Sequence, residues 1–525
     1  MSDPKRAVLL IDGVHKPDNT INGVEQLAQL HGFQPVRMVW IGGTEKMKDP
    51  QSFKEEFKKA FGVEVIMEGD PDTGSADPVA GLHSALETRD IDLVVQLSGS
   101  PQVNRRLMNR FASVAVGYGA AYMAGGTVFA EAASLLEATI PSEGLYATDK
   151  RVGKTTFGIY IAALMSGLRQ IDTPWNAVTM THSRGGPPEP PVLAIYNNPR
   201  DGKDPSQMSL EELYSRRFQP EFLERLLAFG LHGASDVYED AMILSEYLNA
   251  HEASGREVPK MYMVGCRRAG AGYFHEFAVS NVELGIEAAN HSGGDFILHE
   301  GSGGEHPPVR VDGTITLIPS DTDQELLLDF PGLDTTDLII MAHCQPETAD
   351  NATMEAVERI IDERNNRAPI VRTFFEPEVM GDPEEIASVV KGKRAAYFTT
   401  APQSVEKRLA GALASGYELN SVLVSFSLTR DQLMRAEMDE MMAAKNAPEV
   451  FLIEIKARGV EGAGYIQEKY GTPVFYVNNV PRQVDKTGAR MPDNSQMDEL
   501  IVRALNSSVE RFNQRKGADF QLCKL

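Results

Sequence analysis

One short segment of the 525-residue chain carries residue types suited to binding phosphates. Residues 147–156 read Ala-Thr-Asp-Lys-Arg-Val-Gly-Lys-Thr-Thr. A glycine-lysine-threonine ending can hold a nucleotide through main-chain N–H groups, through a lysine ammonium, and through a threonine hydroxyl that binds Mg²⁺. We therefore predict a nucleotide-binding loop. Its expected contact residues are Thr148, Asp149, Val152, Gly153, Lys154, Thr155 and Thr156.

A carboxylate further along the chain is placed to complete a metal site. The segment 299–304, His-Glu-Gly-Ser-Gly-Gly, directly follows the apolar run 296–298. A carboxylate at the end of a buried strand beside a phosphate loop can hold Mg²⁺, directly or through water. We predict that Glu300 and Thr155 form this site. The competing interpretation is an ordinary strand end followed by a turn.

Polar and basic residues elsewhere could bind the rest of a nucleotide or an acidic substrate. Arginines precede glycine-rich segments at two places, where we expect loops at strand ends that suit phosphate or carboxylate. Asn478 follows an apolar run and could read the edge of adenine. The candidates for substrate binding are Arg184, Arg267, Arg268, His15 and Lys456. A surface charge, an ordinary loop or an internal ion pair is the alternative for each.

The residues around the phosphate loop predict the elements that position it. An apolar strand at 145–147 precedes the loop, and apolar residues at helical spacing follow it. That apolar helix face consists of Phe157, Tyr160, Ile161, Leu164 and Leu168. Strand, loop and helix N-terminus together direct N–H dipoles at a bound anion.

The whole chain alternates short apolar runs with helical patterns, which is typical of parallel sheets covered by helices. We predict an α/β protein: a P-loop NTPase domain with a mostly parallel sheet, preceded by a smaller Rossmann-like α/β domain. Four predicted strands lie before the loop, so the first domain is expected at residues 1–135. Residues 140–525 would form the nucleotide-binding and catalytic domain, with room for a subdomain.

Composition excludes several classes of function. The formal net charge of −23 argues against binding nucleic acid through a broad basic face, so a phosphate site must be a local basic pocket. The three cysteines are far apart, which fits a reducing cytoplasm better than a disulfide framework. No run approaches the roughly 18 apolar residues of a membrane span. We expect a cytoplasmic homodimer that binds a small anionic molecule.

Several motifs together resemble a known family. The segments 147–155 and 300–304 are similar to the phosphate loop and metal-binding strand end of dethiobiotin synthetase and its relatives. The rest of the chain resembles the cyclic 2,3-diphosphoglycerate synthetase family more specifically. The matching stretches are residues 10–13, 42–46, 184–190, 234–236, 239–240, 265–268, 399–402 and 454–457. Val14 departs from the family pattern where an acidic residue is expected, and Ala147 departs where glycine is usual.

The resemblance implies an ATP-driven closure of 2,3-diphosphoglycerate into a ring through an internal phosphoanhydride. Lys154, with Mg²⁺ held by Thr155 and Glu300, would stabilise charge on the β and γ phosphates during transfer to a substrate phosphate. Lys150 and Arg151 would also be catalytic, because they offset the repulsion between two anions. The arginines at 184, 267 and 268 would hold the substrate.

Two other functions fit the same residues. The first is an ATP-dependent kinase or ligase that acts on another small acid, since the same pocket chemistry would serve it. The second is a nucleotide-dependent switch ATPase. Such ATPases often carry a lysine at the position of Asp149, so this interpretation ranks last.

Overall fold

The computed structural model describes residues 4–130, 135–168, 174–184, 190, 192–195, 240, 243–244, 247, 261–269, 278–301, 306–345, 348 and 350–524. These residues form two large sheets covered by helices, and most neighbouring strands are parallel. The α/β class predicted from the sequence is therefore confirmed. Among the helices of these ranges, none combines the length and the apolar character that a membrane crossing requires.

The N-terminal sheet has six strands in the order β3-β2-β1-β6-β7-β8. Alternate residues of the central strand β1 (Lys5–Ile11) face two separate cores: Ala7 and Leu9 pack with α1 and α2, whereas Val8 and Leu10 pack with α3 and α4. The other strands are β2 (Phe33–Trp40), β3 (Val65–Ile66), β6 (Leu93–Gln96), β7 (Ala121–Ala124) and β8 (Thr127–Ala130). The helices are α1 (Pro17–His31), α2 (Pro50–Phe61), α3 (Pro78–Leu86) and α4 (Arg105–Gly117).

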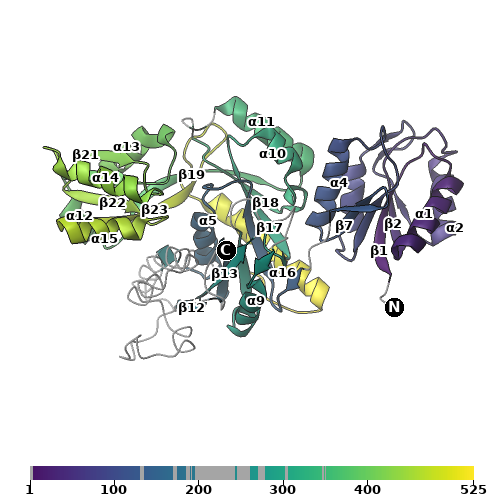
Figure 1. Cartoon of the computed structure of the whole chain (residues 1–525), viewed down its shortest axis with the longest axis horizontal. Coiled ribbons are helices and arrows are strands. Elements are labelled where there is room, and N and C mark those ends of the chain that lie inside the picture. Colours follow the sequence, from purple (N-terminus) through teal and green to yellow (C-terminus); the bar gives the residue numbers. More distant parts are fainter. Residues whose placement is uncertain are drawn as a thin grey trace.

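The second sheet has 13 strands and extends through the centre of the molecule into a lobe built mainly from residues 383–470, called the C-terminal lobe below (Figure 1). Its order is β12-β13-β11-β15-β10-β17-β18-β19-β23-β22-β20-β21, and β14 (Val279–Ser280) pairs with β13. The first part comprises β10 (Ser142–Ala147), β11 (Ala177–Arg184), β12 (Val192–Ile195), β13 (Met261–Ala269), β15 (Phe296–Glu300), β17 (Gly313–Pro319) and β18 (Leu338–Ala342). The second part comprises β19 (Ile370–Val379), β20 (Arg394–Phe398), β21 (Ser421–Ser425), β22 (Val450–Glu454) and β23 (Val474–Gln483).

The two parts of this sheet are joined by two ten-residue strands, β19 and β23. The first residues of β19 pair in parallel with β18, and the remainder pairs antiparallel with β23. Strand β23 in turn pairs with β22 of the C-terminal part. The strands before residue 131 and those from β10 onward belong to separate sheets, and the domain bounds expected from the sequence stay a prediction. The segment after 140 contains two lobes built on one continuous sheet.

Nine helices of the described ranges accompany this sheet. Helix α5 (Lys154–Met165) follows the phosphate loop and is buried from Thr156 to its end, because the sheet and α16 both pack against it. The sequence predicted a single apolar face, so the complete burial is a correction. The other helices are α9 (Val282–His291), α10 (Gln324–Asp329), α11 (Asn351–Arg364), α12 (Pro383–Val390), α13 (Glu406–Gly416), α14 (Asp431–Ala443), α15 (Gly459–Tyr470) and α16 (Ser495–Lys516).

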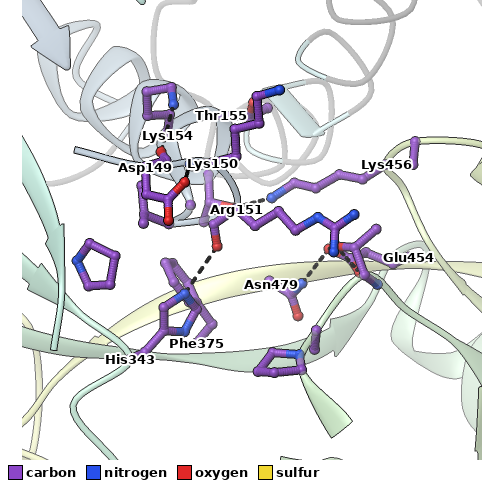
Figure 2. Close-up of a pocket in the computed structure, with 18 of the residues that line it drawn as sticks. Asp149, Lys150, Arg151, Lys154, Thr155, His343, Phe375, Glu454, Lys456 and Asn479 are labelled. Atoms are coloured by element: carbon purple, nitrogen blue, oxygen red, sulfur yellow. Dashed lines mark hydrogen bonds between the residues drawn. The ribbon is translucent and has the colours of Figure 1, made fainter. Parts of the chain in front are cut away.

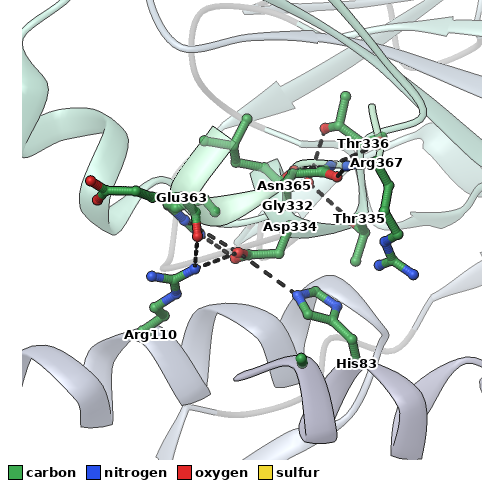
Figure 3. Close-up of polar contacts among 12 residues, drawn as sticks. His83, Arg110, Gly332, Asp334, Thr335, Thr336, Glu363, Asn365 and Arg367 are labelled. Carbon is green, nitrogen blue, oxygen red and sulfur yellow. Dashed lines mark hydrogen bonds and ion pairs between the residues drawn. The ribbon is translucent and has the colours of Figure 1, made fainter. Parts of the chain in front are cut away.

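Buried polar contacts join the N-terminal sheet to the rest of the chain (Figure 3). Asp334, in a short 3₁₀ turn after α10, forms a buried ion pair with Arg364 of α11. From the N-terminal part, His83 Nε2 and Arg110 Nη2 each lie 3.8 Å from Asp334 Oδ1. Burial opposes ionisation of Asp334, but Arg364 and His83 outweigh it and lower its pKa to about 2. This carboxylate is therefore charged at neutral pH and links the two parts.

Candidate active site

A cavity of about 540 Å³ lies between the phosphate loop and the C-terminal lobe. Its walls come from the carboxyl ends of parallel strands in both parts of the second sheet, where α/β proteins generally bind ligands. The central part supplies residues 149–156, Thr181, His182, Glu300, Gly301, Pro319, Asp321, His343, Gln345, Thr348 and Phe375. The C-terminal lobe supplies residues 400–402, Val405, Arg408, Leu409, Thr429, Glu454, Lys456, Ala457 and Asn479.

The phosphate loop has the strand-loop-helix form expected from its sequence. Strand β10 ends at Ala147 and α5 begins at Lys154, so the free N–H groups of the first helical turn face the cavity. Gly153 has φ +87°, and a Cβ added there would lie 2.1 Å from the ring of Phe375. Glycine is therefore required at this position both by the backbone conformation and by the aromatic neighbour.

Thr155 and Glu300 lie side by side, as the predicted metal site requires. The hydroxyl of Thr155 donates to Glu300 Oε1 at 3.0 Å. No group of three or more His, Cys, Asp or Glu residues within the described ranges could hold a metal ion. Thr155 and Glu300 would thus offer one hydroxyl and one carboxylate. This set fits Mg²⁺, which usually takes few protein ligands and completes its shell with phosphates and water.

Lys154 lines the cavity and is partly buried. Burial disfavours its charged form and lowers its pKa to about 8, although the carboxylates of Glu300 and Asp149 act in the opposite direction. Its Nζ lies 3.5 Å from the carbonyl oxygen of Asp149. A bound phosphate would add negative charge here and favour the ammonium form. The site is therefore electrostatically prepared for an anion.

The C-terminal wall is held in place by a single carboxylate. Glu454, at the end of β22, accepts hydrogen bonds from the hydroxyls of Thr399 and Thr400, from the Thr400 N–H, and from Asn479 Nδ2. Lys456 lies two residues further and donates from Nζ to Thr156 Oγ1 at 2.7 Å. In Figure 2 the side chains of Lys456 and Asn479 reach into the space opposite the phosphate loop.

A pair of buried histidines includes His299, the residue next to Glu300. His182 Nε2 is 3.3 Å from His299 Nδ1, and the two rings stack. Burial lowers the pKa of His299 to about 3 and also lowers that of His182, so both rings are neutral at physiological pH. His182 also lines the cavity. No motif singles out this pair, because the two residues are brought together only by the pairing of β11 with β15.

Comparison with known proteins decides the family. Three models of the cyclic 2,3-diphosphoglycerate synthetase family match the chain: its N-terminal domain at 6–130, its P-loop domain at 142–374 and its C-terminal domain at 386–480. A synthetase of that name from Rubrobacter xylanophilus is 30% identical over 483 residues, covering 91% of this chain and 94% of the relative. The chain belongs to the cyclic 2,3-diphosphoglycerate synthetase family.

Relatives with the same name cover almost the whole length of the chain. The proteins from Methanothermus fervidus and Methanothermobacter thermautotrophicus are each 27% identical over 521 residues. These matches cover 98% of this chain, and 100% and 99% of the two relatives. Membership of this synthetase family confirms the resemblance read from the motifs, the P-loop fold and the assignment as an enzyme.

Most residues predicted for nucleotide binding, metal binding and catalysis line the cavity, together with one of the substrate-binding candidates, Lys456. They are Asp149, Lys150, Arg151, Val152, Gly153, Lys154, Thr155, Thr156, Glu300 and Lys456. Thr148 does not line it: this residue is buried below the loop, and its N–H donates to the carbonyl oxygen of Leu317 at 3.1 Å. Asn478 is also outside the lining, whereas its neighbour Asn479 is part of it. Successive side chains of a strand point to opposite faces, so only one of the two adjacent asparagines faces the cavity.

The predicted substrate-binding arginines are placed differently from the expectation. Arg267 and Arg268 belong to β13, which continues to Ala269 in register with β11, so they do not lie on a loop. Neither lines the cavity, although the buried Arg268 is close enough to Lys154 to disfavour the ammonium charge. Arg184 ends β11, and its side chain and the following segment lie outside the described residues.

His15 does not line the cavity; it follows β1 of the N-terminal sheet, which lies apart from the C-terminal lobe (Figure 1). Its Nδ1 lies 2.8 Å from Asp12 Oδ1. The central part of the molecule separates this sheet from the C-terminal lobe that closes the cavity. A substrate held at the phosphate loop would therefore be out of its reach. The structure does not bring His15 together with the other candidates, because it follows a strand of a different sheet.

Proposed function

We propose that the protein uses ATP and Mg²⁺ to convert 2,3-diphosphoglycerate into its cyclic phosphoanhydride. The observation that carries this proposal is the cavity in which a phosphate loop with two additional cations faces a polar wall from the C-terminal lobe. Family membership supports the substrate, because the relatives are named for this product. A volume of about 540 Å³ is within the range for small-molecule sites.

In the first step, an oxygen of one substrate phosphate attacks the γ phosphorus of ATP, and ADP leaves. Bound Mg²⁺ would neutralise charge on the β and γ phosphates. Lys154 and the N–H groups at the start of α5 stabilise the same charges from the protein side. Lys150 and Arg151 lie on the open part of the loop, where they reduce the repulsion between ATP and a second highly charged molecule.

In the second step, the other phosphate of the substrate attacks the phosphorus nearest the glycerate carbon. The new anhydride bond closes the ring, and the terminal phosphoryl group leaves as inorganic phosphate together with the bridging oxygen. Because both phosphates belong to one molecule, the closure is unimolecular and gains the rate advantage of proximity. The net reaction yields the cyclic product, ADP and inorganic phosphate.

Phosphorus NMR of the enzyme with MgATP and 2,3-diphosphoglycerate tests the proposal. We expect a new anhydride resonance to grow at the same rate as those of ADP and phosphate. ATP consumption without that resonance, or turnover only with a different acid, would assign the protein to the alternative kinase or ligase. The homodimer expected from the sequence stays a prediction, and sedimentation velocity would test it.

A further inference from the structure

One histidine contacts the main chain of the phosphate loop from outside it. His343 follows β18 and lines the cavity, and its Nε2 lies 3.1 Å from the carbonyl oxygen of Arg151. A carbonyl oxygen only accepts hydrogen bonds, so Nε2 carries the proton and donates it. Burial lowers the pKa of His343, which keeps the ring neutral.

Both residues of this contact have unusual backbones. Arg151 has φ +64° and His343 has φ +60°, and left-handed conformations cost free energy for residues other than glycine. In the described ranges, three of the five such residues line the cavity: Arg151, His343 and Ala457. Strain of this kind persists only where the surroundings hold it, and the hydrogen bond from His343 is one such constraint.

Phe375 supports the same loop from a second direction. Its ring packs edge-on against that of His343, with centroids 5.3 Å apart, and it occupies the space beside Gly153. The carbonyl oxygen of Phe375 accepts from Arg408 Nη1 of the C-terminal lobe at 2.9 Å. His343 and Phe375 therefore fix the loop on both sides of Val152.

We propose that His343 is a positioning residue that holds the main chain of Arg151 so that its guanidinium projects across the cavity. Figure 2 shows the Arg151 side chain extending from the loop toward Glu454 on the opposite wall. In the proposed reaction, on which this inference rests, that space is where the phosphates of two molecules meet. His343 touches neither the nucleotide nor the substrate in this role; it acts through Arg151.

The decisive variant is His343→Ala, which removes the N–H donor. Trypsin cleaves after lysine and arginine, so its cleavage after Lys150 and Arg151, followed by mass spectrometry without nucleotide, reports directly how firmly the loop is held. We expect cleavage to be faster by about tenfold, the factor for one lost hydrogen bond. We also expect kcat for cyclic product to fall by about tenfold or more, while KM for ATP changes less than about threefold.

Two further variants complete the test. His343→Asn retains an amide donor and tolerates a positive φ better than most residues, so it should recover part of the slow cleavage and part of kcat. His291→Ala is the matched control, because this exposed histidine contacts a backbone carbonyl oxygen on α9, away from the cavity. It should behave as the wild type.

The two proposals can fail separately. If the wild type forms no cyclic product, the proposed function fails, and the cleavage rates still judge the role of His343. If the wild type forms the product and His343→Ala matches it in both cleavage and kcat, the inference about His343 is overturned. A loss of kcat with unchanged cleavage would also overturn it, because His343 would then act by another route than the Arg151 main chain.

Discussion

Lys456 and Thr156 are 300 residues apart in sequence and are joined by a hydrogen bond of 2.7 Å between Nζ and Oγ1. Thr156 belongs to the first turn of α5, and Lys456 follows β22 in the C-terminal lobe. This contact brings a cation from the C-terminal lobe to the phosphate side of the cavity. The lysine thus lies beside the first turn of α5, where we propose that the nucleotide phosphates bind.

Replacing Lys456 should weaken nucleotide binding. We expect Lys456→Met to lower the affinity for ADP by about tenfold, because one charge-assisted contact to phosphate is lost. Isothermal titration calorimetry would measure the change. Lys407→Met, at an exposed position of α13, is the control and should bind ADP as the wild type does. Equal affinities for both variants would show that Lys456 does not contact the nucleotide.

Gly153 should tolerate no side chain. In Gly153→Ala the new Cβ would overlap the ring of Phe375, and the left-handed backbone adds a cost of about 1 kcal/mol. We expect ADP affinity to fall by at least about tenfold, measured by calorimetry. The double variant with Phe375→Ala should recover part of the loss, because the overlap disappears while the backbone cost remains. If the double variant does not recover ADP affinity, the loss in Gly153→Ala does not come from overlap with Phe375.

The proposed reaction sequence predicts the origin of the oxygen atoms in inorganic phosphate. Ring closure transfers one oxygen from the substrate to the departing phosphate, and no oxygen comes from water. We therefore expect phosphate formed in ¹⁸O-labelled water to be unlabelled by mass spectrometry. A switch ATPase would instead release phosphate with one atom of solvent oxygen. A parallel sample without 2,3-diphosphoglycerate measures the background hydrolysis of ATP.

The buried pair of Asp334 and Arg364 should matter greatly for stability. In Asp334→Asn the Arg364 guanidinium keeps its charge but loses its carboxylate, which typically costs about 3–5 kcal/mol. Urea unfolding would report this change. The exposed pair of Glu499 and Arg503 provides the comparison, and Glu499→Gln should cost less than about 1 kcal/mol. Similar losses in both variants would contradict the burial argument.

Glu143 should make stability depend on pH. It is buried at the start of β10, and burial together with Asp337 raises its pKa to about 8, although Ser508 and Arg511 act in the opposite direction. Between its ordinary value of 4.5 and about 8, the folded protein keeps a proton that the unfolded chain releases. The free energy of unfolding should therefore decrease as pH rises through this window.

The variant Glu143→Gln removes that ionisation. Relative to the wild type, its free energy of unfolding should increase by at least about 1 kcal/mol between pH 5 and pH 8. Chemical unfolding at several pH values would measure the difference. In the control Glu283→Gln, at an exposed position of α9, the free energy of unfolding should change with pH as it does in the wild type. A wild type whose stability rises over the same window would contradict the raised pKa.

Local sequence was sufficient for the phosphate loop and for many strands. The glycine, lysine and threonine of the loop lie in one continuous segment and act together with its backbone, so a short stretch of sequence is enough to predict the loop. Strand β17 was missed because Thr314 and Thr316 interrupt its apolar pattern. In the structure the hydroxyl of Thr316 lies 2.7 Å from that of Thr336, so this buried hydroxyl has a hydrogen-bond partner on another segment of the chain.

The opposite wall of the cavity depends on contacts that local sequence does not encode. The run before Asn478 is apolar at every position, so it lacks the alternation that would tell which asparagine faces the ligand. Arg267 lies just before a glycine-rich segment and looks like a loop residue, yet pairing with β11 extends the strand through it. His343 belongs to no motif and reaches the loop only through the order of the strands.

The ribbon formed by β19 and β23 joins the two walls of the cavity. Its strands pair with each other from Thr373 to Val379 of β19, while β18 continues the sheet toward the phosphate loop and β22 continues it into the C-terminal lobe. Main-chain hydrogen bonds therefore connect the two walls, in addition to the covalent chain. The spacing of the walls is thus set by the register of one sheet, so a slip of one residue between β19 and β23 would displace the C-terminal wall relative to the loop.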